Sequence, residues 1–96
     1  MKKEEILSAH KIYQDEVLKK YHAKILGIFG SYARNEESHE SDIDVLVEFN
    51  DKADLFDLVG LSLFLEEKLG RKVDIVAHDA IHTKLKNQII AETIYL

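Results

Sequence analysis

The sequence predicts an α+β fold in which helices pack on a small mixed sheet of three strands. Two long segments carry apolar residues at intervals of three and four, which is the period of a helix. Three short apolar segments have the length and composition of strands: residues 24–29, 42–49 and 72–77. Gly30, Asp42 and Asp44 lie at the ends of these strands, and their positions indicate how the strands run relative to one another.

The composition indicates one soluble domain that covers residues 1–96. Apolar residues make up 46% of the chain and charged residues 32%, which is typical of a globular protein. The net charge of −5 argues against direct binding of nucleic acid, which needs a basic surface. Cysteine is absent, and there is neither a signal-peptide core nor an apolar run of membrane length. We therefore expect a cytoplasmic protein that does not bind membranes.

Residues 2–22 are predicted to form a helix that packs on the sheet, because their apolar residues recur at helical spacing. Those residues are Ile6, Leu7, Ala9, Ile12, Tyr13, Val17, Leu18 and Tyr21. The polar face of this helix is expected to contact solvent, and it comprises Lys3, Glu4, Lys11, Gln14, Asp15 and Lys19. The first strand then covers residues 24–29 and ends at a glycine.

A brief helical turn is predicted over residues 30–34, and a polar loop at residues 35–40 leads to the second strand, residues 42–49. The centre of that strand, residues 45–47, is apolar on both faces. Uninterrupted apolar runs of this kind are typical of strands that are covered on both sides. We therefore expect this strand to lie inside the sheet.

The second long helix is predicted to begin after Asp54, a favourable N-cap residue, and to end at Leu69 before Gly70. Its apolar residues cover more than one stripe: Leu55, Phe56, Leu58, Val59, Leu61, Leu63, Phe64 and Leu65. One face of a sheet does not easily cover that width. The helix therefore either contacts a second chain, in a homo- or hetero-oligomer, or is buried on all sides.

A third helix follows the strand at residues 72–77 and is predicted to begin at Asp79 or Thr83 and to end near Thr93. The chain then closes on the apolar residues 94–96. We expect this apolar end to pack against the rest of the chain, at a place that its short length does not specify.

The order of the strands follows if Gly30 and the aspartates share one site. Gly30 ends the first strand and Asp42 begins the second, so these two strands must run antiparallel. Asp74 lies early in the third strand, as Asp42 and Asp44 do in the second, so the second and third strands must run parallel. The helix between them is then a crossover connection, which is almost always right-handed.

Asp42 and Asp44 point to the same face of their strand, because side chains alternate along a strand. Two carboxylates about 6 Å apart repel each other by roughly 2–3 kcal/mol at an effective dielectric constant near 20. A cation between them removes that cost. Together with Asp74, they are oxygen ligands suited to Mg²⁺. Two such ions about 3.5–4 Å apart can activate an attacking hydroxyl and stabilise a leaving phosphate.

The turn at Gly30 and Ser31 is suited to binding the phosphates of a nucleotide. Glycine lets the backbone approach a ligand closely, and amides at the start of the following helix attract phosphate oxygens. Ser31 adds a hydroxyl donor, and Arg34 can make a bidentate contact with a phosphate. The sequence contains no GxxxxGK segment, so a P-loop is excluded.

Three motifs together resemble the signature of the DNA polymerase β-like nucleotidyltransferases: Gly30-Ser31, Arg34 and Ser41-Asp42-Ile43-Asp44. In size, the chain is most similar to the minimal nucleotidyltransferases, the group of the MNT or MntA-like antitoxins. The resemblance extends over nearly the whole chain and implies the small nucleotidyltransferase fold. Asn35 departs from the pattern, since many members have glycine there. Asparagine also tolerates a left-handed backbone, so we expect a modest effect.

The resemblance also implies a role for each residue of the site. Asp42 and Asp44 would bind both catalytic Mg²⁺ ions. Asp74 would bind one ion and help to deprotonate the acceptor. Gly30 and Ser31 would hold the phosphates of the nucleotide triphosphate.

By resemblance, the reaction is the transfer of AMP from ATP, with pyrophosphate leaving, and the partner is a HEPN-type toxin whose tyrosine is adenylylated. Two alternatives stay open. The chain could be a binding module that masks the toxin without catalysis, which the wide apolar helix and the apolar C-terminus suggest. It could also modify a small hydroxyl compound, although the chain lacks the extra domain with which larger members grip their acceptors.

Some of these residues also have purely structural explanations. Asp74 could be an ordinary charge at the edge of the sheet, and Arg34 could be the partner in a surface salt bridge. His78 and His82 have the spacing of two metal ligands on one helix face. Without a third ligand nearby, we expect them to be surface histidines. Tyr32 either stacks on a base or packs within the fold.

Overall fold

Nine elements make up the fold in a computed structural model that describes residues 2–38 and 41–96. In order they are α1 (Lys3–Tyr21), β1 (Ala23–Phe29), α2 (Gly30–Ala33), β2 (Ile43–Phe49), α3 (Leu55–Leu69), β3 (Val73–Ala77), the 3₁₀ turn η1 (His78–Ala80), α4 (Thr83–Glu92) and β4 (Ile94–Tyr95). The predicted polar loop is described as far as Ser38, and its last two residues, 39 and 40, lie outside the described residues. No helix in the described ranges is long and apolar enough to cross a membrane.

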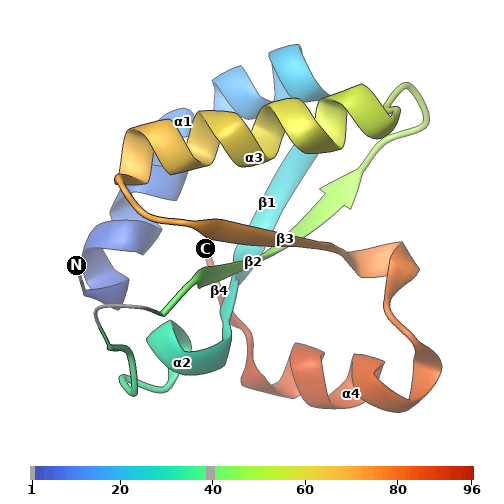
Figure 1. Cartoon of the computed structure of the whole chain (residues 1–96). Helices are drawn as coiled ribbons and strands as arrows, with labels where there is room; N and C mark the ends of the chain where they lie inside the picture. The colour runs from blue at the N-terminus through green and yellow to red at the C-terminus, as the bar shows by residue number, and fades with distance from the viewer. Residues whose placement is uncertain (1, 39–40) are drawn as a thin grey trace.

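The predicted segments agree with these elements to within one or two residues, with one choice now settled. Of the two starting points for the last helix, the structure uses Thr83, and Asp79 belongs to the separate turn η1. Helices α1 and α3 pack together over one face of the sheet, and α2 and α4 lie away from them (Figure 1).

The four strands lie in the order β3-β2-β1-β4. Strand β1 runs antiparallel to β2, with Phe29 opposite Asp44, and β2 runs parallel to β3, with Asp44 opposite Asp74. This is the arrangement that a shared site of Gly30 and the aspartates required. The sheet has four strands where the sequence predicted three. The apolar end of the chain forms β4, which pairs with β1 at Gly27 and Ile28.

Gly27 makes room for β4 on β1. A Cβ atom at this position would overlap the carbonyl oxygen of Ile94 and would lie 2.9 Å from Cγ2 of Thr93. The register between β1 and β2 shifts next to it, between Ile25 and Gly27, as in a β-bulge. The amide of Leu96 then donates to the carbonyl of Leu26 at 3.0 Å. The bulge and the missing side chain together fix the end of the chain.

Side chains from the helices cover backbone groups at both margins of the sheet. Gln14 of α1 donates through Nε2 to the carbonyl of Ile25 and accepts from the amide of Ile25 through Oε1, both at 2.9 Å. The expectation that Gln14 faces solvent was therefore wrong, because helical spacing alone does not identify a polar side chain that replaces a strand partner. At the other margin, the amide of Val73 donates to Glu66 of α3 at 3.1 Å.

Helix α3 begins and ends at the residues that the sequence indicated. The Asp54 carboxylate accepts from the amide of Asp57, and the Asp57 carboxylate accepts from the amide of Asp54, both at 3.0 Å. This reciprocal pair is a capping box. Gly70 ends the helix with a left-handed φ of 67°. His22 at the end of α1 contacts Asp57 at 3.1 Å and so joins the two helices.

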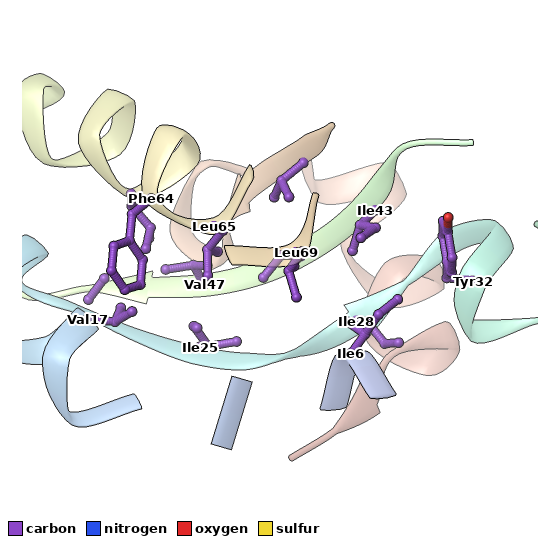
Figure 2. Close-up of a cluster of buried hydrophobic side chains, with 14 of the residues drawn as sticks. Ile6, Val17, Ile25, Ile28, Tyr32, Ile43, Val47, Phe64, Leu65 and Leu69 are labelled. Carbon is purple, nitrogen blue, oxygen red and sulfur yellow. The ribbon is translucent and has the colours of Figure 1, made fainter. Parts of the chain in front are cut away.

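The hydrophobic core lies between the sheet and the pair α1 and α3 (Figure 2). Its largest fully buried apolar side chains are Tyr32, Ile6, Ile25, Ile28, Ile43, Leu61 and Leu65. The ring of Tyr32 is 1% exposed, so it packs in the core and is not available to stack on a base. Helix α3 is not buried on all sides, because Leu55, Phe56, Val59 and Leu63 are each more than half exposed.

One polar residue in this packed layer has no hydrogen-bond partner. His10 on α1 is fully buried, and neither of its ring nitrogens is paired within the described residues. Burial lowers the pKa of His10 from 6.5 to about 4, because the charged ring loses its hydration. A buried polar group without a hydrogen bond also costs stability, because it gives up its hydrogen bonds to water and gains none in the fold.

We expect His10→Leu to raise the free energy of unfolding by about 1–2 kcal/mol at neutral pH, because leucine buries no unpaired nitrogen. Between pH 6.5 and 4 the unfolded chain protonates this histidine before the folded chain does, so wild-type stability falls as the pH falls. Urea unfolding across this range should show the advantage of the variant growing toward low pH. An advantage that stays constant or shrinks would contradict the assignment.

Candidate active site

Two of the predicted aspartates face each other across adjacent parallel strands. Asp44 of β2 and Asp74 of β3 are register partners, so their side chains leave the same face of the sheet from strands about 4.8 Å apart. Asp42 precedes β2 by one residue and is exposed, as is Asp74. Asp44 is partly buried. The parallel pairing therefore gathers the three carboxyl groups at one end of the sheet.

Gly30 lies directly against Asp44. The antiparallel pairing of Phe29 with Asp44 brings the start of α2 to this carboxylate. A Cβ atom on Gly30 would overlap Oδ2 of Asp44 and would lie 3.1 Å from its Cγ, and the φ of Gly30 is +74°. Both the close approach and the left-handed backbone require glycine here. The structure thus brings together the Gly-Ser turn and the Asp-x-Asp strand.

The electrostatics of Asp44 show how strongly these groups interact. The pKa of Asp44 is raised from 3.8 to about 6 by burial first and then by the negative charges of Asp74 and Asp42, and the positive charge of Arg34 opposes this shift. At neutral pH the carboxylate is therefore held in an unfavourable, negatively charged environment. A divalent cation would neutralise that charge.

The donor set fits a hard cation such as Mg²⁺, since it offers carboxylate oxygens and no soft ligand. Within residues 2–38 and 41–96, however, no three acidic or histidine side chains stand close enough to hold one ion together. The magnesium site therefore stays a prediction that rests on Asp42, Asp44 and Asp74.

Ser31 lies in the first turn of the short helix α2 and is partly exposed. Its carbonyl accepts from the amide of Glu36 at 2.8 Å, which folds the following loop back on the turn. Asn35 has a φ of 58°, the left-handed backbone that asparagine tolerates. The substitution of asparagine for glycine thus leaves the turn in place. Phosphate binding by Ser31 stays a prediction.

Arg34 has the surface salt bridges that its structural explanation anticipated. Its Nε lies 3.0 Å from Oε2 of Glu36, and its Nη1 lies 3.3 Å from Oε2 of Glu92. Its charge also reaches Asp44, whose pKa it lowers. The sequence analysis missed Glu92, because 58 residues separate it from Arg34 and no local pattern marks it. The salt bridges hold the guanidinium beside the acidic site, where a phosphate can compete for it.

His78 and His82 each make a separate contact with a neighbour in sequence. His78 contacts its neighbour Asp79 at 3.2 Å, and His82 accepts from the amide of Lys84 at 3.2 Å as the N-cap of α4. The sequence-based preference for ordinary surface histidines is in line with these separate contacts.

Comparison with known proteins gives a family for this arrangement. The model of the nucleotidyltransferase domain family matches residues 10–96. A protein of Methanocaldococcus jannaschii named as a candidate protein adenylyltransferase is 49% identical over 78 residues, which make up 81% of this chain and 84% of that protein. The protein adenylyltransferase MntA of Thermococcus cleftensis is 33% identical over 93 residues, or 97% of this chain and 91% of that protein.

Solved structures share the fold. One described as a minimal nucleotidyltransferase has a TM-score of 0.85 and 33% identity, and the match covers 100% of this chain and 97% of that one. A toxin–antitoxin complex with AMP-PNP has a TM-score of 0.72 and 26% identity, over 93% and 72% of the two chains. A Shewanella oneidensis complex of a tri-AMPylated HEPN toxin with its MNT antitoxin has a TM-score of 0.63 and 25% identity, over 94% and 69%.

Gly30, Asp44 and Asp74 lie together at one end of the sheet, and the family model matches this site and nearly all of the chain. The chain belongs to the nucleotidyltransferase domain family and has the fold of the minimal nucleotidyltransferases.

Proposed function

We propose that this chain is a Mg²⁺-dependent protein adenylyltransferase that transfers AMP from ATP to a tyrosine of a HEPN-type toxin and so acts as its antitoxin. The observation that carries the proposal is the position of Asp44, which lies against Gly30 and in register with Asp74. The names of the relatives and the AMP-PNP and AMPylated toxin complexes support the substrate and the partner.

Each residue then has a defined task. Asp42, Asp44 and Asp74 would hold the Mg²⁺ ions, which neutralise phosphate charge and lower the pKa of the attacking hydroxyl. Asp74, which is exposed, would accept the proton of the tyrosine hydroxyl. The tyrosine oxygen bonds to the α-phosphorus of ATP, the bond from that phosphorus to its bridging oxygen breaks, and pyrophosphate leaves.

The phosphate side of the site is formed by the chain around α2. Gly30 leaves room for the Asp44 carboxylate against the backbone, and Ser31 offers a hydroxyl to the phosphates. Arg34 is held beside the carboxylates by Glu36 and Glu92 at the surface. A triphosphate that carries more charge than one carboxylate can displace these glutamates from the guanidinium.

A second candidate function is neutralisation of the toxin by masking, with catalysis absent. The exposed apolar side chains of α3 favour it, because a contiguous apolar surface is typical of a protein contact. The two candidates differ in one respect: masking would persist in a variant without the aspartates.

We expect Asp42→Asn/Asp44→Asn to reduce AMP transfer more than about 100-fold, since even partners outside the ligand shell of a metal are worth 10–100-fold. The measurement uses the chain co-purified with its toxin, Mg²⁺ and ATP labelled at the α-phosphate, with γ-labelled ATP as a control. Asp15→Asn, which changes an exposed carboxylate on α1, is the matched control and should keep full transfer. Undiminished transfer by the double variant would rule out the proposed site, and protection of cells by an inactive variant would favour masking.

A pair of glycines with the same backbone offers a test of the contact between Gly30 and Asp44. Gly30→Ala and Gly70→Ala each place a methyl group on a left-handed backbone, with φ of +74° and +67°, and this backbone strain alone should cost each variant about 1 kcal/mol of stability. Only at Gly30 does the methyl group overlap a carboxylate, because nothing lies within 4 Å of a Cβ at Gly70. Transfer should therefore be lost in Gly30→Ala alone. Equal activity of the two variants would show that the contact is unimportant.

The raised pKa of Asp44 predicts that Asp44→Asn stabilises the metal-free protein while it removes activity. A folded pKa of about 6 against 3.8 means that the ionised carboxylate destabilises the fold at pH 7, and that this penalty is lost progressively as the pH falls from 6 to 3.8. Because Asp44 is only partly buried and solvent screens its charge, we expect a gain of about 1 kcal/mol at pH 7. Thermal unfolding in EDTA would measure it. A variant that is less stable than wild type at pH 7 would contradict the electrostatic account.

A further inference from the structure

A hollow opens at the edge of the sheet, between helix α3 and strand β3. Its volume is about 280 Å³, and both elements contribute to its wall. The lining residues are Leu58, Val59, Ser62 and Leu63 of α3 and residues 73–75 of β3. Val59 and Leu63 are 52% and 61% exposed, so they form an accessible rim. Because Asp74 is part of the wall, the hollow adjoins the candidate active site.

The wall of the hollow is suited to an apolar group. Apart from Ser62 and Asp74, its lining residues are leucine, valine and isoleucine. The Ser62 hydroxyl donates to the carbonyl of Val73 at 3.5 Å, and the amide of Val73 donates to Glu66 at 3.1 Å. The backbone of Val73 therefore already has its partners. A group that enters the hollow is stabilised mainly by the removal of apolar surface from water.

The size of the hollow fits one side chain. Pockets for whole small molecules have volumes of roughly 300–1,000 Å³, and the 280 Å³ of this hollow lies just below that range. A cavity of about 150 Å³ with a similar apolar lining is large enough for benzene. The hollow therefore has room for one aliphatic or aromatic side chain, and a nucleotide triphosphate is too large for it.

Strand β3 separates the hollow from the carboxylate of Asp74. Val73 is buried in the core layer under α3, and Ile75 packs against that layer. Because side chains alternate along a strand, Asp74 points to the opposite face, where it is in register with Asp44. Strand β3 is at the edge of the sheet. A protein segment that lies along this edge therefore meets the hollow on one side and the Asp74 carboxylate on the other.

We infer that the hollow is an acceptor subsite, which takes an apolar side chain of the acceptor protein while a nearby hydroxyl of that protein reaches Asp74. The inference rests on the proposed transfer of AMP to a protein and adds how that protein is selected. Water and small hydroxyl compounds have no such side chain, so the hollow favours a protein acceptor over both. Val59 and Leu63 then determine specificity through binding, and they take no part in the chemical step.

The test is the kinetics of AMP transfer to the co-purified acceptor protein, separated from the chain and added back at increasing concentration with Mg²⁺ and ATP. Leu63→Ser should raise the KM for this protein about tenfold and leave kcat within about twofold, because the contact stabilises the ground state and the transition state equally. Ile12→Ser on α1, a side chain that is 74% exposed away from the hollow, is the matched control and should keep both constants. Circular dichroism should be unchanged in both variants.

A second variant distinguishes a hollow that must stay empty from a surface that is merely apolar. Val59→Trp adds apolar area at the rim but occupies the hollow, so it should also raise the KM for the acceptor protein, again about tenfold. An apolar surface without a specific recess would bind the acceptor protein more tightly in this variant.

Both variants should leave the KM for ATP unchanged. A rise confined to the KM for ATP would assign the hollow to the nucleotide and overturn the inference. An unchanged KM for the acceptor protein in Leu63→Ser, or a lower one in Val59→Trp, would overturn it as well while the wild-type chain still transfers AMP. Absence of transfer by the wild-type chain would contradict the proposed function itself, and the subsite with it.

Discussion

The repulsion among three carboxylates is the constraint on which the rest of this structure depends. Asp42 lies just before β2, Asp44 lies in β2 and Asp74 lies in β3, and the negative charges of Asp74 and Asp42 raise the pKa of Asp44. No local interaction would bring like charges together in so small a chain. They are held there because burial of the strands around them, at Ile43, Val45 and Val73, stabilises the fold by more than the charges destabilise it.

The elements around the site can be understood as the supports of that arrangement. Antiparallel pairing of β1 with β2 carries the α2 turn to the carboxylates, and the crossover through α3 sets β3 parallel to β2. The capping box at Asp54 and the left-handed Gly70 fix where the crossover helix begins and ends. The carboxylates of the candidate site therefore lie at one end of the sheet, while the buried apolar side chains that stabilise the fold lie in the layer under α1 and α3.

The bounds of the helices and the directions of the first three strands could be predicted from the sequence, because they depend on residues that are close in sequence or on how the strands connect. The Asp54 cap, the Gly70 end and the alternation of Asp42 and Asp44 each depend on neighbours in sequence. The strand directions followed from requiring one site. Strand β4 could not be predicted, since two residues show no period.

Other features depend on contacts between distant segments, and local patterns contain no trace of them. Gln14 looked like a solvent-facing residue because only the position of Ile25 reveals its role. The burial of His10 on an apolar face and the pairing of Arg34 with Glu92 were missed for the same reason. The family resemblance supplied roles for the aspartates, but the closeness of Gly30 to Asp44 became visible only in three dimensions.

The side chains that cover the two margins of the sheet have a consequence for assembly. An uncovered strand edge is a template on which further strands can add without limit, as they do in amyloid. Here the side-chain amide of Gln14 forms hydrogen bonds with the backbone of Ile25 at one margin. At the other margin, the side chains of Glu66 and Ser62 on α3 form hydrogen bonds with the backbone of Val73. These side chains pair with backbone groups of Ile25 and Val73 that an added strand would otherwise use, so they disfavour strand addition at these two positions. The chain can therefore expose an apolar helix face to a partner while these positions of its sheet stay closed to another strand.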